Sequence, residues 1–135
     1  MTGRIVFSTE NTFDSVAEAS ARLGEFAEKN GLPPRKTYQL ELIYEELMTN
    51  IVKYSYPDQD PHRIQVRLDY EGDKLTFTIM HDGEDFNPWT QDDPDLTLPL
   101  EHRQEGGIGI LLCRKFSLST DYRRQDGKSI ITTVI

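Results

Sequence analysis

The stretch YEELMTNIVKYSY, from Tyr44 to Tyr56, has the periodicity of a helix that packs against a core. The apolar face of this helix would be formed by Ile43, Leu47, Ile51 and Tyr54. Beside that face, Glu46, Asn50 and Lys53 follow one another at intervals of about one helical turn. Asparagine is a poor helix-interior residue, because its amide competes for backbone groups. The polar stripe therefore needs an explanation beyond helix formation.

The sequence before this helix predicts a strand and a further helix. Pro33-Pro34 opens the helix described above. Near the N-terminus, the β-branched run Arg4–Ser8 predicts a strand. Between them, Asn11 or Thr12 can cap a helix that Asn30-Gly31 closes. The apolar face of that helix would carry Phe13, Val16, Ser20, Leu23 and Phe26.

The sequence after the quoted stretch predicts four strands, a long loop and another helix. Two alternating runs, Ile64–Tyr70 and Leu75–Ile79, flank the turn Glu71-Gly72-Asp73 and indicate an antiparallel hairpin. The periodicity then dissolves, and a loop of that length, at about 84–105, is usually a lid or a binding loop. The remaining elements are a helix in GGIGILLCRKF and strands around Leu118–Arg123 and Lys128–Ile135. This order predicts an α+β fold, with helices layered on one face of a mostly antiparallel sheet.

Length and composition are those of an ordinary globular protein. We expect residues 1–135 to form a single domain. No apolar run is long enough to span a membrane, and no export leader is recognisable. The single cysteine, Cys113, excludes an internal disulfide and fits a reducing cytosol. The net charge of −8 argues against nucleic acid as a partner, but backbone amides and a metal ion can still hold a polyphosphate.

Three short motifs carry candidate chemistry. In the helical stripe, Asn50 could offer a hard oxygen to Mg²⁺ while Glu46 orients or deprotonates a hydroxyl; the alternative is that Asn50 caps a loop and Glu46 is merely solvated. Lys53 could meet a phosphate, although a lone lysine on a helix is usually only solvated. The second motif, MHDGEDFNP (80–88), follows a strand, and the third, EGGIGI (105–110), places glycines before a helix, which suits phosphate. Each of the last two motifs is weak alone.

The order of these motifs gives them weight. The chain resembles the GHKL (histidine kinase-like) superfamily of ATP-binding domains, and within it the small anti-sigma-factor serine/threonine kinases of bacterial partner-switching systems. The resemblance extends from about Ile5 to Ile135 and is strongest in DLTLPLEHRQEGGIGI, residues 95–110. It implies a two-layer α/β sandwich of the Bergerat type, with Mg-ATP as the ligand.

The resemblance also implies roles for single residues. Glu46 would be the catalytic base, and Asn50 would be the Mg²⁺ ligand. The residues that would surround the nucleotide or shape the lid are Lys53, His81, Asp82, Gly83, Phe86, Arg103, Gly106, Gly107 and Gly109. Among them, the three glycines from Gly106 to Gly109 would cradle the phosphates, and the transfer to Lys53 and Arg103 is looser.

The sequence departs from the family pattern at the position that meets adenine. The family has Asp-x-Gly after the central strand, where the aspartate accepts a hydrogen bond from the adenine amino group, and this chain has His81 there. A neutral imidazole can accept that bond in only one tautomer. Asp82 could replace it only through a shifted register. Loss of the acceptor would cost about 1–3 kcal/mol, or one to two decades of affinity. Asp85 and Ser117 depart from the pattern as well.

Other candidate residues have plainer interpretations. His62 and His102 lack cysteine or carboxylate partners at metal-binding spacing, so we expect surface histidines. Cys113 fits a core position, and Trp89 could contact a partner or cover the site.

Two functions of different classes follow. The first is a kinase that phosphorylates a serine of an antagonist protein and sequesters a sigma factor or similar output protein, with a homodimer as the expected assembly. The second is a non-catalytic sequestration module of the same fold, which His81 favours. A third interpretation, the ATPase part of a sensor histidine kinase, is disfavoured because no phosphoacceptor helix is recognisable.

Overall fold

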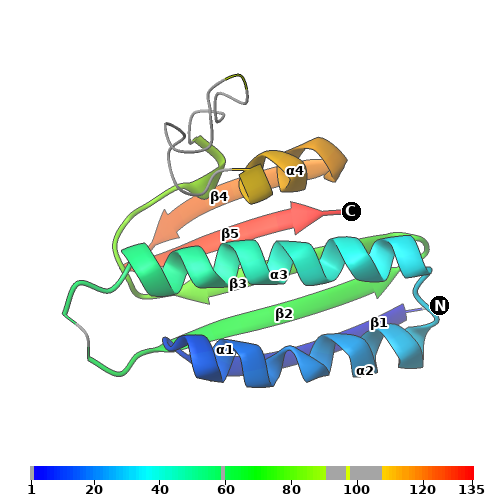
Figure 1. Ribbon diagram of the computed structural model, residues 1–135, viewed down its shortest axis with the longest axis horizontal. Helices are drawn as coiled ribbons and strands as arrows, with labels where there is room; N and C mark the ends of the chain where they lie inside the picture. The colour runs from blue at the N-terminus through cyan, green and yellow to red at the C-terminus, as the bar shows by residue number, and fades with distance from the viewer. Residues whose placement is uncertain (1, 59, 91–96, 98–107) are drawn as a thin grey trace.

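The described part of the protein is an antiparallel sheet covered by helices. The computed structural model describes residues 2–58, 60–90, 97 and 108–135. Within them the sheet order is β1-β2-β3-β5-β4, and all neighbouring strands are antiparallel. The strands are β1 (Thr2–Glu10), β2 (Arg63–Glu71), β3 (Lys74–His81), β4 (Ser119–Gln125) and β5 (Lys128–Val134). The helices are α1 (Phe13–Ala19), α2 (Ala21–Asn30), α3 (Pro34–Tyr54), the 3-10 helix η1 (Pro88–Thr90) and α4 (Ile108–Phe116). The α-helices lie on one face of the sheet, so the predicted α+β, two-layer fold is confirmed (Figure 1).

One row of side chains crosses the sheet and forms the centre of the core. Phe7, Val66, Ile79 and Ile131 are paired in register across β1, β2, β3 and β5, and all four are buried. Residues paired across antiparallel strands share a face, so one alternating pattern buries the whole row. The predicted β2–β3 hairpin is present, and Gly72 takes the positive φ of 65° that its turn requires. Because Ile79 belongs to this row, the packing of the row positions the end of β3, where the motif of residues 80–88 begins.

The first predicted helix is interrupted in the structure. Thr12 caps α1 as expected, through a hydrogen bond from the Ser15 N–H to its Oγ1, and Gly31 ends α2 with a φ of 65°. At Ser20, however, the chain leaves the regular helix and α2 begins anew. The Tyr44 hydroxyl donates to the carbonyl of Val16, which would otherwise accept from Ser20. The single-helix prediction is therefore wrong, because a tertiary hydrogen bond competes with the helical one.

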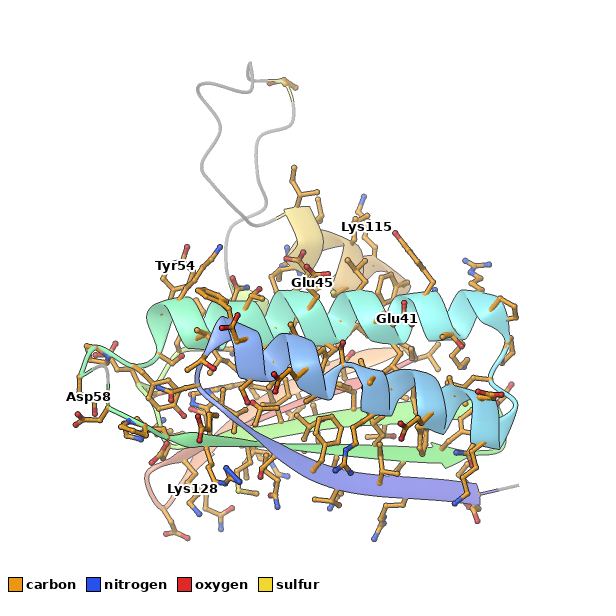
Figure 2. The ribbon with its side chains drawn as sticks, turned by 60° about the horizontal axis from the view of Figure 1, so that its bottom comes forward. Glu41, Glu45, Tyr54, Asp58, Lys115 and Lys128 are labelled. Carbon is orange, nitrogen blue, oxygen red and sulfur yellow. The ribbon has the colours of Figure 1, made fainter. Side chains whose placement is uncertain are left out.

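Helix α3 runs along the strands, over the middle of the sheet, and carries the polar stripe (Figure 1). Pro34 stands at its first turn, and six of its side chains are buried: Leu40, Ile43, Tyr44, Leu47, Met48 and Ile51. Tyr54 is not part of this face; its side chain is 53% exposed and points away from the sheet (Figure 2). The prediction that Tyr54 belongs to the core face is therefore wrong. Tyr54 is the last residue of α3. No helix among the described residues is long and apolar enough to cross a membrane.

Candidate functional site

The polar stripe and the glycine-rich helix meet in space. Glu46 is half-buried on α3, and Gly109 lies in the first turn of α4 directly against it. A Cβ added to Gly109 would lie 1.9 Å from Cδ of Glu46, so any larger residue would displace the carboxyl group. The two motifs are 63 positions apart in sequence, by the difference of their numbers. Their contact therefore joins the candidate base to a candidate phosphate-binding segment.

The surroundings of Glu46 alter its acidity. Burial, and secondarily the neighbouring carboxylate of Glu45, raise the pKa of Glu46, while Lys53 opposes that shift. Lys53 itself is exposed in the last turn of α3. A carboxylate with a raised pKa is a better proton acceptor once it is ionised. Glu46 is therefore a partly buried carboxyl group with a perturbed pKa, and not a fully solvated surface glutamate.

Asn50 lies one turn beyond Glu46 and is only partly exposed. Within the described part of the chain, its side-chain amide makes no hydrogen bond, so it does not cap a described loop. Its side-chain oxygen is a hard donor on the same helix face as the Glu46 carboxylate, and a hard oxygen is the ligand type that Mg²⁺ takes. The residues present thus fit a magnesium-bound phosphate.

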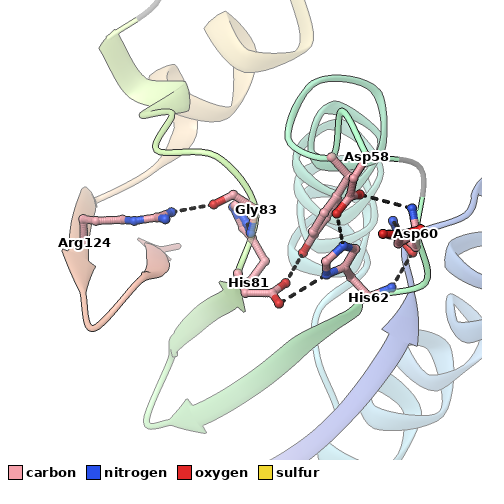
Figure 3. A network of polar contacts seen from close by, with 9 residues as sticks. Asp58, Asp60, His62, His81, Gly83 and Arg124 are labelled. Carbon is pink, nitrogen blue, oxygen red and sulfur yellow. Dashed lines mark hydrogen bonds and ion pairs between the residues drawn. The ribbon is translucent and has the colours of Figure 1, made fainter.

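The loop after β3 is pinned to the end of α3. The backbone N–H of Glu84 donates to the carbonyl of Ser55 at 2.9 Å. A Cβ on Gly83 would lie 2.6 Å from that same carbonyl oxygen, so only glycine allows this approach. Arg124 of β4 donates to the carbonyl of Gly83 at 2.7 Å and to Ser129 at 2.8 Å (Figure 3). Gly83 is therefore held from two sides, by α3 and by the β4–β5 hairpin.

His81 closes the inner end of this loop. Its side chain is 2% exposed, and Nδ1 accepts a hydrogen bond from the N–H of Gly83 at 3.0 Å. Burial lowers the pKa of His81 to about 4, and the positive charge of Arg124 acts in the same direction. The ring is consequently neutral at physiological pH.

A small cavity lies between His81 and the stripe. Its volume is about 10 Å³, which is room for about one water molecule. The lining residues come from α3, the end of β3, the following loop and β5: Leu47, Asn50, Ile51, Ser55, His81, Phe86, Pro88 and Ile131. A purine base is larger than this cavity. Base binding here requires the segment with Phe86 and Pro88 to move outward.

Asp82 is not brought to this cavity. Its carboxylate accepts from the Tyr56 hydroxyl at 3.0 Å and contacts Nδ1 of His62 at 3.2 Å, on the exposed side of β3. His62 also contacts Asp58 at 2.9 Å and stacks on the Tyr56 ring (Figure 3). His62 thus has two carboxylate contacts that the sequence did not reveal. No group of three possible metal ligands occurs among the described residues, so the structure does not contradict the expectation that His62 is no zinc ligand.

Three of the predicted site residues lie outside the described residues: Arg103, Gly106 and Gly107. Most of the predicted lid, and His102, lie outside them as well. At the start of that segment, Trp89 is buried and its indole N–H donates to the carbonyl of Asp121 at 3.1 Å, so it anchors η1 to β4. Sequence reasoning missed Arg124, whose role depends on a strand pairing that brings β4 beside the loop.

Comparison with known proteins agrees with this geometry. The sequence profile of the histidine kinase-like ATPase domain matches residues 9–135. The chain belongs to this family. The prediction of superfamily membership from the motif order is thereby confirmed.

Two proteins similar to this histidine kinase-like ATPase domain indicate its type more closely. The serine/threonine-protein kinase BtrW of Bordetella bronchiseptica is 26% identical over 121 residues, which are 90% of this chain and 85% of that protein. A crystal structure of the RsbU and RsbW domains of Rv1364c from Mycobacterium tuberculosis superimposes with a TM-score of 0.64 at 12% identity. It covers 98% of this chain, but the chain spans only 32% of that protein. This likeness supports the fold, and the first relative supports a kinase-like regulator.

Proposed function

We propose that the protein is a regulatory serine/threonine kinase that transfers the γ-phosphoryl group of a bound purine nucleoside triphosphate to a serine of an antagonist protein. Family membership makes ATP the expected nucleotide. The observation that carries the proposal is the pairing of Glu46 and Asn50 on α3, with Gly109 of α4 against the carboxyl group. The antagonist, and a sigma factor or similar output protein that the kinase sequesters, complete the proposed cycle, with a homodimer as the proposed assembly.

Each proposed role follows from the position of the residue. The oxygen of the substrate hydroxyl bonds to the γ-phosphorus, and the bond from phosphorus to the leaving diphosphate breaks. Glu46 takes the proton of that hydroxyl during this step. Asn50 would hold Mg²⁺, which when bound offsets negative charge on the phosphate oxygens. Lys53 supplies a positive charge on the same face, and the backbone N–H groups of Gly106, Gly107 and Gly109 would bind the phosphates.

The remaining predicted residues have supporting roles in this proposal. Gly83 brings the loop after β3 against α3, Phe86 lines the cavity beside Asn50, and Arg103 would meet a phosphate. The segment at about 84–105 would be the lid. Asp82 is left outside the proposed site, because its carboxylate is engaged by Tyr56 and His62.

Phosphoryl transfer to a candidate antagonist, followed by phosphoserine detection, tests the proposal. Glu46→Gln should lower the transfer rate by roughly 10²–10⁴-fold and leave nucleotide affinity within about threefold, because glutamine keeps the shape and loses the base. Glu41→Gln is the matched control, since Glu41 is an exposed glutamate of the same helix and should transfer normally. Equal rates for wild type and Glu46→Gln would contradict the proposal.

The alternative is a sequestration module without transfer. The observation that favours it is His81 in place of the family's aspartate, with its Nδ1 already accepting from the N–H of Gly83. In that case the antagonist and the output protein bind with an affinity that neither Glu46→Gln nor chelation of Mg²⁺ changes. No phosphoserine forms on any partner. The same two proteins and the same two variants distinguish the alternatives.

A further inference from the structure

A groove runs between helices α1 and α2 on one side and α3 on the other. Its first hollow has a volume of about 560 Å³, and the buried side chains of Val16, Leu23 and Tyr44 form the floor. A second hollow, of about 390 Å³, adjoins the first, because its lining includes Gly24, the residue after Leu23. The groove follows the length over which α1 and α2 lie beside α3 (Figure 1).

Small residues keep this groove open. Ala17, Ser20 and Gly24 recur every three or four positions along its α1–α2 wall, and all three are exposed. A Cβ added to Gly24 would meet no atom within 4 Å, so the space beside this residue is free. Below them, the hydrogen bond from the Tyr44 hydroxyl to the carbonyl of Val16 ties α1 to α3. The tie holds the helices in place, and the small residues leave the space between them unfilled.

The groove combines apolar contact surface with negative charge. Two large side chains on its lining are exposed, Phe13 of the first hollow by 50% and Tyr38 of the second by 65%. Exposed glutamates stand at its rim, among them Glu45 of α3 (Figure 2) and Glu28 of α2. Neither of these two forms an ion pair with another described residue. Among the described residues that line the two hollows there is no lysine, arginine or histidine. Such a surface is complementary to aliphatic side chains flanked by positive charge.

The dimensions of the groove favour a helix as its occupant. Thr37 and Thr49 are the outermost α3 residues of the lining, and the helical rise between them is about 18 Å, or about three turns. The walls are helices, which have no row of free backbone groups for a strand to pair with. An extended segment on this floor would therefore leave backbone groups unpaired, whereas a helix satisfies its own. The net charge of −8 disfavours an anionic lipid surface as the occupant.

We propose that this groove is a docking site for an amphipathic helix of a partner protein, with aliphatic side chains on one face and lysine or arginine on its flanks. Glu46 and Asn50 line neither hollow, so a helix held there is not presented to the candidate base. The surface therefore suits a partner that is sequestered rather than phosphorylated. The inference rests on the sequestration part of the proposed function, and it names the chemistry of the sequestered partner.

Fluorescence anisotropy of two labelled model peptides, titrated with the whole chain at physiological ionic strength, tests the inference. Both peptides are amphipathic helices of about 15 residues with the same leucine face, and they differ only in carrying lysine or glutamate on the polar face. The wild type should bind the lysine peptide saturably and at least about tenfold more tightly than the glutamate peptide. Gly24→Leu places a side chain in the open space beside α2, so it should weaken binding of the lysine peptide by about tenfold or more.

Two charge-matched variants separate the groove from the net charge of the molecule. Glu28→Lys combined with Glu45→Lys reverses two charges at the rim and should also weaken binding by about tenfold or more. Glu18→Lys combined with Glu25→Lys reverses two exposed glutamates that line neither hollow, so binding should stay within about threefold of wild type. Circular dichroism and thermal unfolding check that each variant is folded, and the charge variants decide if Gly24→Leu is not.

Several outcomes would overturn the inference. Equal losses in the two charge variants would show that binding follows net charge. Binding of the lysine peptide that Gly24→Leu leaves unchanged, or no binding of either peptide to the wild type, would show that the groove takes no such helix. A wild-type dimer that Gly24→Leu dissociates in analytical sedimentation would assign the groove to a second copy of the chain. These assays contain no nucleotide, so their failure leaves the proposed phosphoryl transfer standing, and failure of transfer leaves the docking site standing.

Discussion

At the scale of the residue, Glu46 is a carboxyl group that folding places in partial burial beside Gly109. Its raised pKa means that the folded state favours the protonated form. Such a group contributes stability at low pH, and that contribution is lost as pH rises through the folded-state pKa. The partial burial of Glu46 thus lowers the free energy of unfolding at neutral pH. Such a cost is expected of a group that is retained for function.

Glu46→Gln should therefore raise the free energy of unfolding relative to wild type, and the gain should grow as pH rises from about 4 to 7. Urea unfolding at several pH values measures it. Glu45→Gln removes a carboxylate that helps to raise the pKa of Glu46, so it should weaken this trend in the protein without abolishing it. A gain that is the same at pH 4 and at pH 7 would mean that Glu46 is not perturbed by burial.

At the scale of the element, the contact between α3 and α4 depends on the absence of one side chain. Gly109→Ala places a methyl group on the carboxyl group of Glu46, so α4 or the Glu46 side chain must shift. We expect a loss of about 1–3 kcal/mol in the free energy of unfolding, as for other overpacked sites, together with weaker nucleotide binding.

The matched substitution is Gly24→Ala in α2, where an added Cβ meets nothing within 4 Å. It should be neutral or stabilise by up to about 1 kcal/mol, because alanine is the better helix former. Thermal and urea unfolding of both variants compare the two sites. If Gly109→Ala behaved like Gly24→Ala, the close approach of α4 to Glu46 would be refuted.

A second element-scale contact joins the α3–β2 connection to the end of β3. There His62 lies between Asp58 and Asp82, and the hydrogen bond to Asp58 is the main cause of the raised pKa of His62. A histidine with a raised folded-state pKa stabilises the protein below its unfolded pKa of about 6.5, and that stability is lost as pH rises through the folded value.

The free energy of unfolding should accordingly fall as pH rises above about 6.5, and His62→Asn should abolish this slope. His81 does not contribute to that window, because its lowered pKa places its effect below pH 6.5. Chemical unfolding from pH 6 to 8 provides the comparison. An unchanged slope in the variant would show that the contacts of His62 are not ionic.

At the scale of the whole molecule, the elements were predictable because local patterns determine them. Alternation identified the β2–β3 hairpin, and Pro33-Pro34 and Gly31 identified helix ends. The break at Ser20 and the exposure of Tyr54 were not predictable, because a partner from another helix decides the first and the end of α3 decides the second. Both depend on packing that no local window contains.

In the candidate site, too, some features were predictable from the sequence and others were not. Glu46 and Asn50 stand one turn apart by helix geometry alone, so their neighbourhood could be predicted. The contact of Gly109 with Glu46, and the support of Gly83 by Arg124, arise only when distant strands and helices pack. The hydrogen bond from the N–H of Gly83 to Nδ1 of His81 likewise depends on how the loop after β3 folds, which the sequence pattern does not specify.

The function proposed for this protein requires that α3 carry a magnesium-dependent nucleotide site. Calorimetric titration of the wild type and of Asn50→Ala with purine nucleoside triphosphates, with and without Mg²⁺, tests it most directly. We predict saturable binding to the wild type that weakens at least tenfold without Mg²⁺, and an Asn50→Ala variant whose affinity no longer responds to Mg²⁺. No binding at millimolar nucleotide, or binding that is indifferent to both Mg²⁺ and Asn50, would contradict the claim.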